Sequence, residues 1–576
     1  YYDALYGVTF RTEEGVVEQR QCPNGASIGS LPPTPTLTGY AFEGWWTAAD
    51  GEQATGETIV SDDVTYYAKW RGTATVDDYT YTYSVLNGQA EIGSSNAWRR
   101  AVSPSPTGHV AVPSSLGSFP VVGIGDYAFY GFYSASYKLE SVTIPDGVTR
   151  IGKRAFSGCP NLTDVTIPAS MAVVDDGAFS GCPDLKGVHI ADLANWCRIM
   201  FVYFSNPLRQ AHELYLNGER VTRLTIPEGV AAIGDDAFAG CSGLTDVTIP
   251  NSVTNIGILA FEGCHGLTNI VVEPENANYT SKNGLLLTKD GRTLVQGVNG
   301  VVEIPSGVTV VGESAFRDLD NLTQVTIPAG VEVVGPFAFY GCGGLEDVSI
   351  PASVTSIGQR AFAACGRLKA LSVEAGNEVY SSRNGMLLNK DGTTLILGVN
   401  GDVEIPSGVV TIGEWAFAYY TGLTRVGIPT SVRDIGAYAF HYCESLTNVV
   451  MQGGVTNIGD GAFGGCGKLT GIVIPNGVTS IGQAAFMDCT GLTDVLIPNS
   501  VQSIGYNAFG WCGRLSNVTL PAYMVEGDDG WTMWNVFQGT SVENVTMAEG
   551  ITTIGSYAFA QGFEDETCPT HVTIPN

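Results

Sequence analysis

The stretch from Leu244 to Gly266, LTDVTIPNSVTNIGILAFEGCHG, decides the fold because close copies of it follow one another along the chain. The other close copies begin at Leu322, Leu345, Leu423, Leu446, Leu469 and Leu492. Within them the dipeptide Ala-Phe recurs at a basic interval of 23 residues. Self-similarity at a fixed period of this size is typical of repeat arrays. We therefore expect a solenoid of about fifteen coils of this length.

Each copy carries the pattern of a short strand with one buried face. Val247 and Ile249 alternate with polar neighbours, and Pro250 then removes the next backbone donor. A second apolar pair, Val253 and Ile256, precedes a glycine, and the Ala-Phe-x-x-Cys segment closes the coil. One coil buries too little apolar surface to offset the entropy of ordering its residues, so the coils must stack in order to fold.

The recurring motifs V-x-I-P, V-x-x-I-G and A-F-x-x-C resemble the BspA-like, or Treponema-type, leucine-rich repeat over roughly residues 110–576. The resemblance implies a mainly β leucine-rich-repeat solenoid. It also implies a secreted or cell-surface protein of bacterial type, whose partners are host or matrix proteins or glycans.

The N-terminal part has a different pattern. Residues 7–70, with GYAFEGWW at 39–46 and YYAKW at 66–70, are similar to the Listeria–Bacteroides repeat, a small β-grasp-like module of secreted surface proteins. The expected domains are this module at 1–70, a linker and N-terminal cap with a hairpin around Asn87-Gly88 at 71–110, and the solenoid at 111–576.

Two homologous inserts, near 271–302 and 373–402, lengthen the interval between phenylalanines from 23 to 55 residues. Each has Asp-Gly between two apolar runs, which is a strong hairpin signal. We expect both to be β-hairpins that project from the solenoid.

Two further irregularities interrupt the period. An insert near 188–223 is expected to hold a short helix capped by Asp192, followed by a hairpin that starts at Leu214. A degenerate coil is expected at 522–546, around Phe537. Irregular segments on a repeat scaffold often carry function.

Charge and hydropathy exclude two classes of partner. With 57 acidic and 28 basic residues, the net charge is −29, which repels nucleic acid and anionic lipid. No apolar run approaches the roughly 20 residues that a membrane-spanning helix needs. We expect no nucleic-acid partner and no membrane insertion by this chain.

The sequence predicts no catalytic, metal or cofactor site, and hence no enzyme. The 6 histidines have no metal-binding spacing. The run from Gly25 to Gly29 matches a nucleophile-elbow pattern but lacks the required α/β context. Ten of the 13 cysteines fall three residues after the repeat phenylalanine. We interpret them as small buried side chains, although disulfides between adjacent coils stay open as an alternative.

Aromatic residues at outward repeat positions are the first binding candidate. Trp415 and Tyr438 share one repeat position, and Tyr419 and Tyr442 share another, so stacking should bring them together with Tyr420 and His441 nearby. Clusters of exposed aromatic residues supply large contact areas for ligands. The competing interpretation is a locally larger core.

An apolar stripe is the second binding candidate. Val450, Val473 and Leu496, spaced 23 residues apart, replace the usual Thr or Ser at an outward strand position. Such a stripe marks an interaction surface, unless β-propensity alone explains it.

The leading functional hypothesis is adhesion or ligand binding outside the cell by a non-catalytic solenoid. The alternative is self-assembly into a surface layer or filament with other copies of the chain. Its motivation is that residues 574–576 follow a strand without an evident polar cap.

Overall fold

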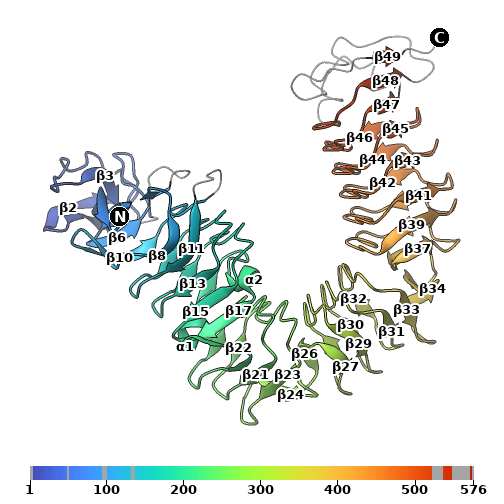
Figure 1. Ribbon diagram of the computed structural model, residues 1–576, viewed down its shortest axis with the longest axis horizontal. Coiled ribbons are helices and arrows are strands. Elements are labelled where there is room, and N and C mark those ends of the chain that lie inside the picture. The colour runs from blue at the N-terminus through green and yellow to red at the C-terminus, as the bar shows by residue number, and fades with distance from the viewer. Residues whose placement is uncertain are drawn as a thin grey trace. The chain divides into compact units, whose positions relative to one another are not determined.

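The computed structural model describes residues 4–48, 51–93, 100–131, 137–521, 536–547 and 571–573. The chain divides into two compact units (Figure 1), which consist of residues 1–245 with 249–264 and of residues 246–248 with 265–576. Strands dominate both units, as the repeat pattern predicts. In the described part of the chain the only helices are α1 (Leu193–Trp196) and α2 (Leu208–Ala211).

The N-terminal module is a mixed β-sheet with an aromatic core. Its strands are β1 (Leu5–Thr12), β2 (Gly15–Pro23), β3 (Ala41–Trp46) and β4 (Val64–Val76). β1 lies between β2, which is antiparallel to it, and β4, which is parallel, and β3 pairs with the other edge of β4. The Phe10 ring lies 5.3 Å from Trp45 and 5.5 Å from Tyr66, and all three side chains are buried. These three aromatic side chains therefore belong to the core of the module.

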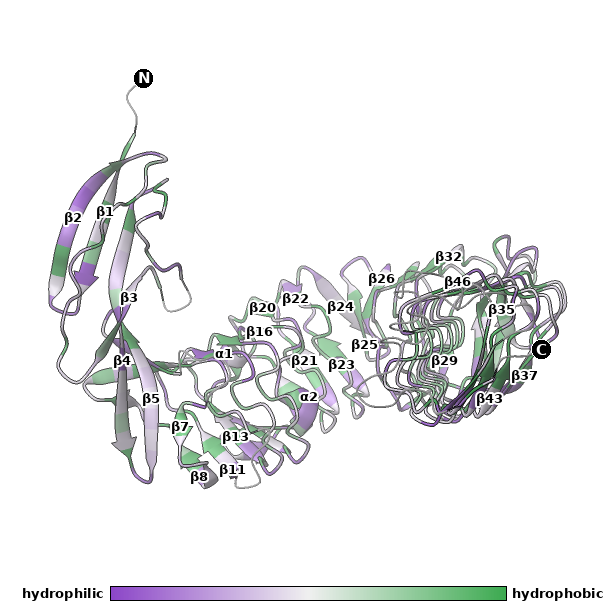
Figure 2. Ribbon diagram, turned by 90° about the horizontal axis from the view of Figure 1, so that it is seen from above, coloured by the Kyte–Doolittle hydropathy of each residue, from purple (hydrophilic) through white to green (hydrophobic). Residues whose placement is uncertain are grey.

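The boundary expected at residue 70 lies inside a strand. β4 continues to Val76 and pairs with β5 (Tyr79–Leu86), as Figure 2 shows. β5 then turns back into β6 (Gln89–Ile92). The turn at Asn87-Gly88 has φ values of 49° and 72°, so the expected hairpin is confirmed. Because β6 pairs in parallel with β10 (Phe119–Ile124), this hairpin caps the first coil and is continuous with the module.

Each coil contributes a longer strand from V-x-I-P and a two-residue strand from V-x-x-I-G. In the first unit the longer strands are β8 (Thr107–Ala111), β11 (Lys138–Thr143), β13 (Asp164–Ile167), β15 (Gly187–Ile190), β17 (Glu213–Leu216) and β19 (Arg223–Thr225). The short strands there are β12 (Arg150–Ile151), β14 (Val173–Val174), β16 (Met200–Phe201), β20 (Ala232–Ile233) and β22 (Asn255–Ile256). The smaller accessory strands are β7 (Val102–Ser103), β9 (Ser115–Leu116) and β18 (Glu219–Arg220).

The same two-strand coil continues in the second unit. After β21 (Asp246–Ile249), the longer strands are β23 (Asn269–Val272), β27 (Gly300–Glu303), β29 (Leu322–Thr326), β31 (Asp347–Ile350), β33 (Ala370–Val373), β37 (Gly401–Glu404), β39 (Leu423–Ile428), β41 (Asn448–Met451), β43 (Gly471–Val473), β45 (Asp494–Leu496), β47 (Asn517–Leu520), β48 (Asn544–Met547) and β49 (His571–Thr573). The short strands are β28 (Val310–Val311), β30 (Val333–Val334), β32 (Ser356–Ile357), β38 (Thr411–Ile412), β40 (Asp434–Ile435), β42 (Asn457–Ile458), β44 (Ser480–Ile481) and β46 (Ser503–Ile504). Figure 1 shows β42, β44 and β46 on one side of the stack and β41, β43 and β45 on the other.

Successive coils pair in parallel at a register of one repeat. Ile435 pairs with Ile458, which pairs with Ile481, so equivalent residues form columns along the stack. The phenylalanine column from Phe417 to Phe537 has ring centroids 4.8 to 5.6 Å apart. This spacing follows the distance of about 4.8 Å between paired strands. Phe537 continues the column, and the rest of the expected degenerate coil, residues 522–535, lies outside the described residues.

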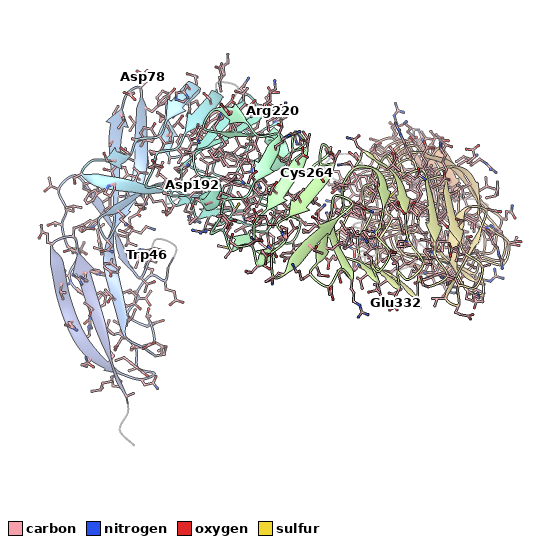
Figure 3. All side chains as sticks on the ribbon, turned by 90° about the horizontal axis from the view of Figure 1, so that it is seen from below. Trp46, Asp78, Asp192, Arg220, Cys264 and Glu332 are labelled. Carbon is pink, nitrogen blue, oxygen red and sulfur yellow. The ribbon has the colours of Figure 1, made fainter. Side chains whose placement is uncertain are left out.

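The cysteine column lies inside the coils. The Sγ of Cys342 donates to the carbonyl of Phe316 over 3.1 Å, and that of Cys466 donates to Phe440 over 3.2 Å. Cys264, labelled in Figure 3, is fully buried in the same way. Every described cysteine is a free buried thiol, so the interpretation as small core residues is confirmed and the disulfide alternative is wrong for them. In these coils the parallel register aligns the thiol with the phenylalanine carbonyl of the preceding coil.

The two matched inserts do not project from the solenoid. Their strands are β24 (Tyr279–Lys282), β25 (Leu285–Thr288) and β26 (Thr293–Gln296), and β34 (Tyr380–Arg383), β35 (Met386–Asn389) and β36 (Thr394–Leu397). The hairpins around Asp-Gly exist, but β26 and β36 pair in parallel with the short strands β28 and β38. The expectation of projecting hairpins is wrong, because their apolar runs, such as Leu285 to Leu287, are buried as the core of an additional coil.

Each insert coil lacks a phenylalanine. A Cβ on Gly297 would lie 2.1 Å from the Phe316 ring, and one on Gly398 would lie 1.9 Å from the Phe417 ring. The ring of the following coil therefore occupies the space that a side chain would need. Counting phenylalanines misses these coils, and the expected number of about fifteen coils is roughly consistent with the solenoid of about 18 turns.

The third insert contains the expected helix and hairpin. The Asn195 N–H donates to the Asp192 carboxylate over 2.9 Å at the start of α1, where Figure 3 labels Asp192. Trp196 is buried, and its Nε1 donates to the carbonyl of Ala237 over 2.8 Å. β17 and β18 form the expected antiparallel hairpin. The second helix, α2, has no counterpart in the sequence-based prediction.

Candidate functional site

Nine side chains in the second unit form a connected surface that we call the aromatic ledge. They come from the turns on either side of the buried Ala-Phe pairs. Its members are Arg317, Phe337, Tyr340, Arg360, Trp415, Tyr419, Tyr438, His441 and Tyr442. Sequence reasoning named the four Trp and Tyr residues between 415 and 442 at these positions, and the structure brings them together.

The backbone of the ledge is left-handed at two positions in each coil. Two residues before the phenylalanine, Trp415 and Tyr438 have φ values of 60° and 57°, and two residues after it, Tyr419 and Tyr442 have 62° and 51°. At the second position several other coils have glycine, namely Gly158, Gly181, Gly240, Gly263, Gly341 and Gly465. Glycine takes this conformation at no steric cost, whereas a larger residue pays about 1 kcal/mol or more.

One stack runs through Trp415. The Arg360 guanidinium lies 3.4 Å from the centroid of one face of the indole, and the Tyr438 ring lies 4.3 Å away at an interplanar angle of 14°. The two stacking partners, Tyr438 from the next coil and Arg360 from the coil before the insert, leave the ring edges as the accessible part of this stack. The cation above the ring is also held by cation–π attraction.

A second stack joins Tyr419 and Tyr442, whose ring centroids are 5.5 Å apart at an interplanar angle of 11°. His441 stands edge-on to both stacks, 5.2 Å from the Tyr438 ring and 4.5 Å from the Tyr442 ring. Burial lowers the pKa of the His441 imidazole. The neutral ring therefore acts as an aromatic spacer between the stacks at neutral pH.

Tyr420 is not part of this surface, and the expectation that placed it there is wrong. Its side chain is fully buried, and its hydroxyl donates to the carbonyl of Phe362 over 3.2 Å. The residue lies three positions after Phe417, in the cysteine column. A cysteine would be too short here, because the intervening insert coil has no phenylalanine carbonyl to offer and the hydroxyl must reach the coil before it.

Sequence reasoning missed the members of the ledge on the N-terminal side of the second insert. Phe337 and Arg360 have φ values of 55° and 56° and occupy the same repeat position as Trp415. The Arg317 guanidinium lies 5.4 Å from the Phe337 ring. An alignment of this column across the inserts, rather than between adjacent repeats, would have revealed them.

The apolar stripe lies on the other strand layer of the second unit. Val473 pairs with Leu496 in register, and Val473 is 76% exposed. Val450, Val473 and Leu496 are all on the outer face of their strands. Beside Val473 and Leu496 lies a shallow groove of about 440 Å³, which Asn448, Gly471, Asp494 and Asn517 also line.

The groove has a polar border. The Asn517 amide donates to the Asp494 carboxylate over 2.5 Å, and the Asn544 amide donates to the Asn517 side-chain oxygen over 2.9 Å. Gly471 has no side chain at the repeat position of Asp494, Asn517 and Asn544, and nothing lies within 4 Å of the place a Cβ would take there. The groove is thus an open surface rather than an enclosed site.

The described parts of the chain can be compared with the requirements of metal sites, nucleophile elbows and membrane-spanning helices. Among the residues the structure describes, no group of three or more His, Cys, Asp and Glu side chains could hold a metal ion. Ser27, from the elbow-like motif, lies in an isolated antiparallel bridge with Ile59 instead of a strand-to-helix turn. Within the same described residues, no helix is long and apolar enough to cross a membrane.

Comparison with known families identifies both kinds of module. The model of the BspA-type leucine-rich repeat region matches six times, at residues 118–208, 211–284, 300–390, 400–516, 456–564 and 533–574. The model of the Listeria–Bacteroides repeat domain matches residues 6–69. No curated protein matches the chain.

Solved structures of bacterial leucine-rich repeat proteins are similar to the chain. A leucine-rich cell-surface protein from Faecalibacterium prausnitzii is 28% identical over 77% of this chain and 94% of its own, with a TM-score of 0.38. A leucine-rich repeat protein from Eubacterium ventriosum is 24% identical over 73% and 95%, with a TM-score of 0.37. One from Bacteroides ovatus is 25% identical over 78% and 94%, with a TM-score of 0.29.

Proposed function

The chain belongs to the family of BspA-type leucine-rich repeat proteins, and from this premise we propose that it is a non-catalytic binding protein at the cell surface or outside the cell. Its repeat scaffold presents the aromatic ledge to a host or matrix protein. The alternative, self-assembly through solenoid ends, depended on residues 574–576, which lie outside the described residues.

The observation that carries the proposal is the backbone conformation of the ledge. Trp415, Tyr419, Tyr438 and Tyr442 all have positive φ, where bulky side chains cost about 1 to 2 kcal/mol each. Folding does not require large residues there, because other coils of the same array have glycine at the position of Trp415 and Tyr438, as at Gly461, and at the position of Tyr419 and Tyr442, as at Gly465. Among the described coils, only those of Phe417 and Phe440 have aromatic residues at both of these positions, and the side chains are half-buried or, at Tyr442, exposed. Strain at side chains that the core does not need is typical of functional surfaces.

The orientation of the rings favours a protein over a glycan as the partner of the ledge. A sugar ring stacks on an open aromatic face, but Arg360 and Tyr438 are stacked against the Trp415 ring. What the ledge offers is ring edges, tyrosine hydroxyls and guanidinium groups. Tyrosine, tryptophan and arginine in this setting are the residues that dominate protein–protein binding energy.

The proposal predicts that the double variant Trp415→Ala/Tyr438→Ala loses binding to an immobilised array of purified matrix proteins. A matched control is Trp511→Ala, because Trp511 is a tryptophan with the same φ, 60°, as Trp415 and is exposed, but lies outside the ledge. Surface plasmon resonance on the full chain should show weaker binding for the double variant and unchanged binding for the control. Equal binding by the double variant and the wild type would remove the ledge as the site.

A further inference from the structure

A second exposed aromatic pair lies in the first unit, in the irregular insert between the coils of Phe179 and Phe238. Tyr203 and Phe204 are 80% and 55% exposed, and both have positive φ, 45° and 61°. Two consecutive bulky residues in the left-handed region are rare, since each costs about 1 to 2 kcal/mol. The two strained residues have exposed side chains, which the core does not need.

The loop that carries this pair is fixed on both sides by buried hydrogen bonds. The Val202 N–H and the Ser205 hydroxyl both donate to the carbonyl of Val174, over 3.0 and 2.6 Å. The Asn206 amide donates to the carbonyl of Asp236 over 2.7 Å, and its side-chain oxygen accepts from the Leu208 N–H over 2.9 Å. Two strained residues are thus held in one conformation by their buried neighbours.

Arg209 fixes the Phe204 ring from below. Its guanidinium carbon lies 4.6 Å from the ring centroid, and it pairs with the carboxylates of Asp236, over 2.5 Å, and of Glu262. Both carboxylates belong to nearly buried residues, so the guanidinium has a defined position. A side chain immobilised in this way loses little conformational entropy when a ligand binds.

These residues enclose a pocket of about 210 Å³ with mixed chemistry. Tyr203 and Phe204 line the pocket with aromatic surface. Its polar lining consists of side chains from Asp176, Ser180, Arg209 and Gln210. Ser180 and Gln210 are exposed, so their donors and acceptors are accessible. The volume is below the range of about 300 to 1,000 Å³ of pockets for drug-sized ligands, and suits one ring-sized unit.

The charges around the pocket disfavour an anionic ligand. Arg209 is offset by two carboxylates, and Asp176 faces the pocket with Lys153 3.4 Å away. These groups leave no net positive charge, on a chain whose net charge is −29. A ligand with an apolar face for the rings and neutral hydroxyls for the polar groups fits both the lining and the charge.

We propose that this pocket binds one neutral sugar ring of a glycan chain, which stacks on Tyr203 and forms hydrogen bonds with Gln210, Ser180 and Asp176. The site is separate from the aromatic ledge and does not depend on the ledge being functional. It adds glycan binding by the first unit to protein binding by the second.

Affinity electrophoresis of the full chain tests this site. Native gels would contain an α-mannan, a mixed-linkage β-glucan or a galactan, with polygalacturonate and gelatin as acidic and protein probes. We expect at least one neutral polysaccharide to retard the wild type, and Tyr203→Gly to weaken the interaction about tenfold or more. Tyr203→Phe should keep it, because the ring remains. Trp415→Ala should also keep it, because the ledge is not involved.

Unfolding measurements exclude a trivial loss. Since φ at position 203 is 45°, Tyr203→Gly should unfold at a midpoint no lower than the wild type. If the midpoint falls, the exposed Gln210→Ala variant decides, with an expected severalfold loss of retardation. The inference is overturned if no neutral polysaccharide retards the chain, if only polygalacturonate or gelatin binds, or if the variants and the wild type are retarded equally.

Discussion

Replacing Tyr442 tests whether the aromatic ledge stores backbone strain. Its φ is 51°, and its N–H donates to the carbonyl of Gly464 over 2.7 Å, a bond that any substitution keeps. Both Tyr442→Ala and Tyr442→Gly remove the stack on Tyr419 and the edge contact with His441, each worth about 0.5 to 1.5 kcal/mol. Only the glycine variant also removes the left-handed penalty of about 1 to 2 kcal/mol.

We therefore expect Tyr442→Gly to be more stable than Tyr442→Ala by about 1 kcal/mol, after allowing for the greater entropy of glycine in the unfolded chain. Equilibrium urea unfolding of the full chain, followed by circular dichroism, measures the difference. The same pair of substitutions at Val450, in the regular strand β41, should give the opposite order, since glycine weakens a strand. If glycine is the less stable variant at both positions, the strain argument for the ledge is wrong.

Three further predictions concern the core and the insert. Tyr420→Phe should destabilise the chain by about 1 to 2 kcal/mol in urea unfolding, because the buried carbonyl of Phe362 loses its donor. Burial raises the pKa of the Cys466 thiol to about 12, whereas an unburied thiol ionises near 9.0. The contribution of this thiol to the free energy of unfolding should therefore be complete below about pH 9 and fall towards pH 12, because the thiol ionises first in the unfolded chain. Urea midpoints measured against pH should fall less steeply for Cys466→Ala than for the wild type. Asp192→Ala should cost about 1 kcal/mol in thermal unfolding, because the Asn195 N–H loses its acceptor, and an unchanged midpoint would contradict this capping role.

The elements that follow local periodicity could be predicted from the sequence. Strands, the phenylalanine and cysteine columns and the Asp192 cap each depend on residues at fixed spacing within one coil, so their placement needs no knowledge of distant neighbours. The matched inserts were predicted only in part. Their Asp-Gly turns are local signals, but whether a hairpin projects or joins the stack depends on whether the next coil buries its apolar run, as happens with Leu285 to Leu287.

Two features of the candidate sites were beyond the sequence for the same reason. Tyr420 and Tyr419 are adjacent tyrosines, and only the missing phenylalanine of the insert coil turns the first towards the carbonyl of Phe362 and leaves the second on the surface. The pocket around Tyr203 has no motif at all, because it arises where an irregular loop is fixed by carbonyls of other coils.

The sequence by itself determined the coil and its stacking, because a 23-residue period repeats the same burial pattern until only one register satisfies every copy. Only the tertiary structure decided which outward side chains form a surface. Exposure and ring stacking depend on which residues of the neighbouring coil lie alongside. Positive φ at Trp415 or Tyr203 indicates a functional surface only when the structure shows that the core does not need the side chain.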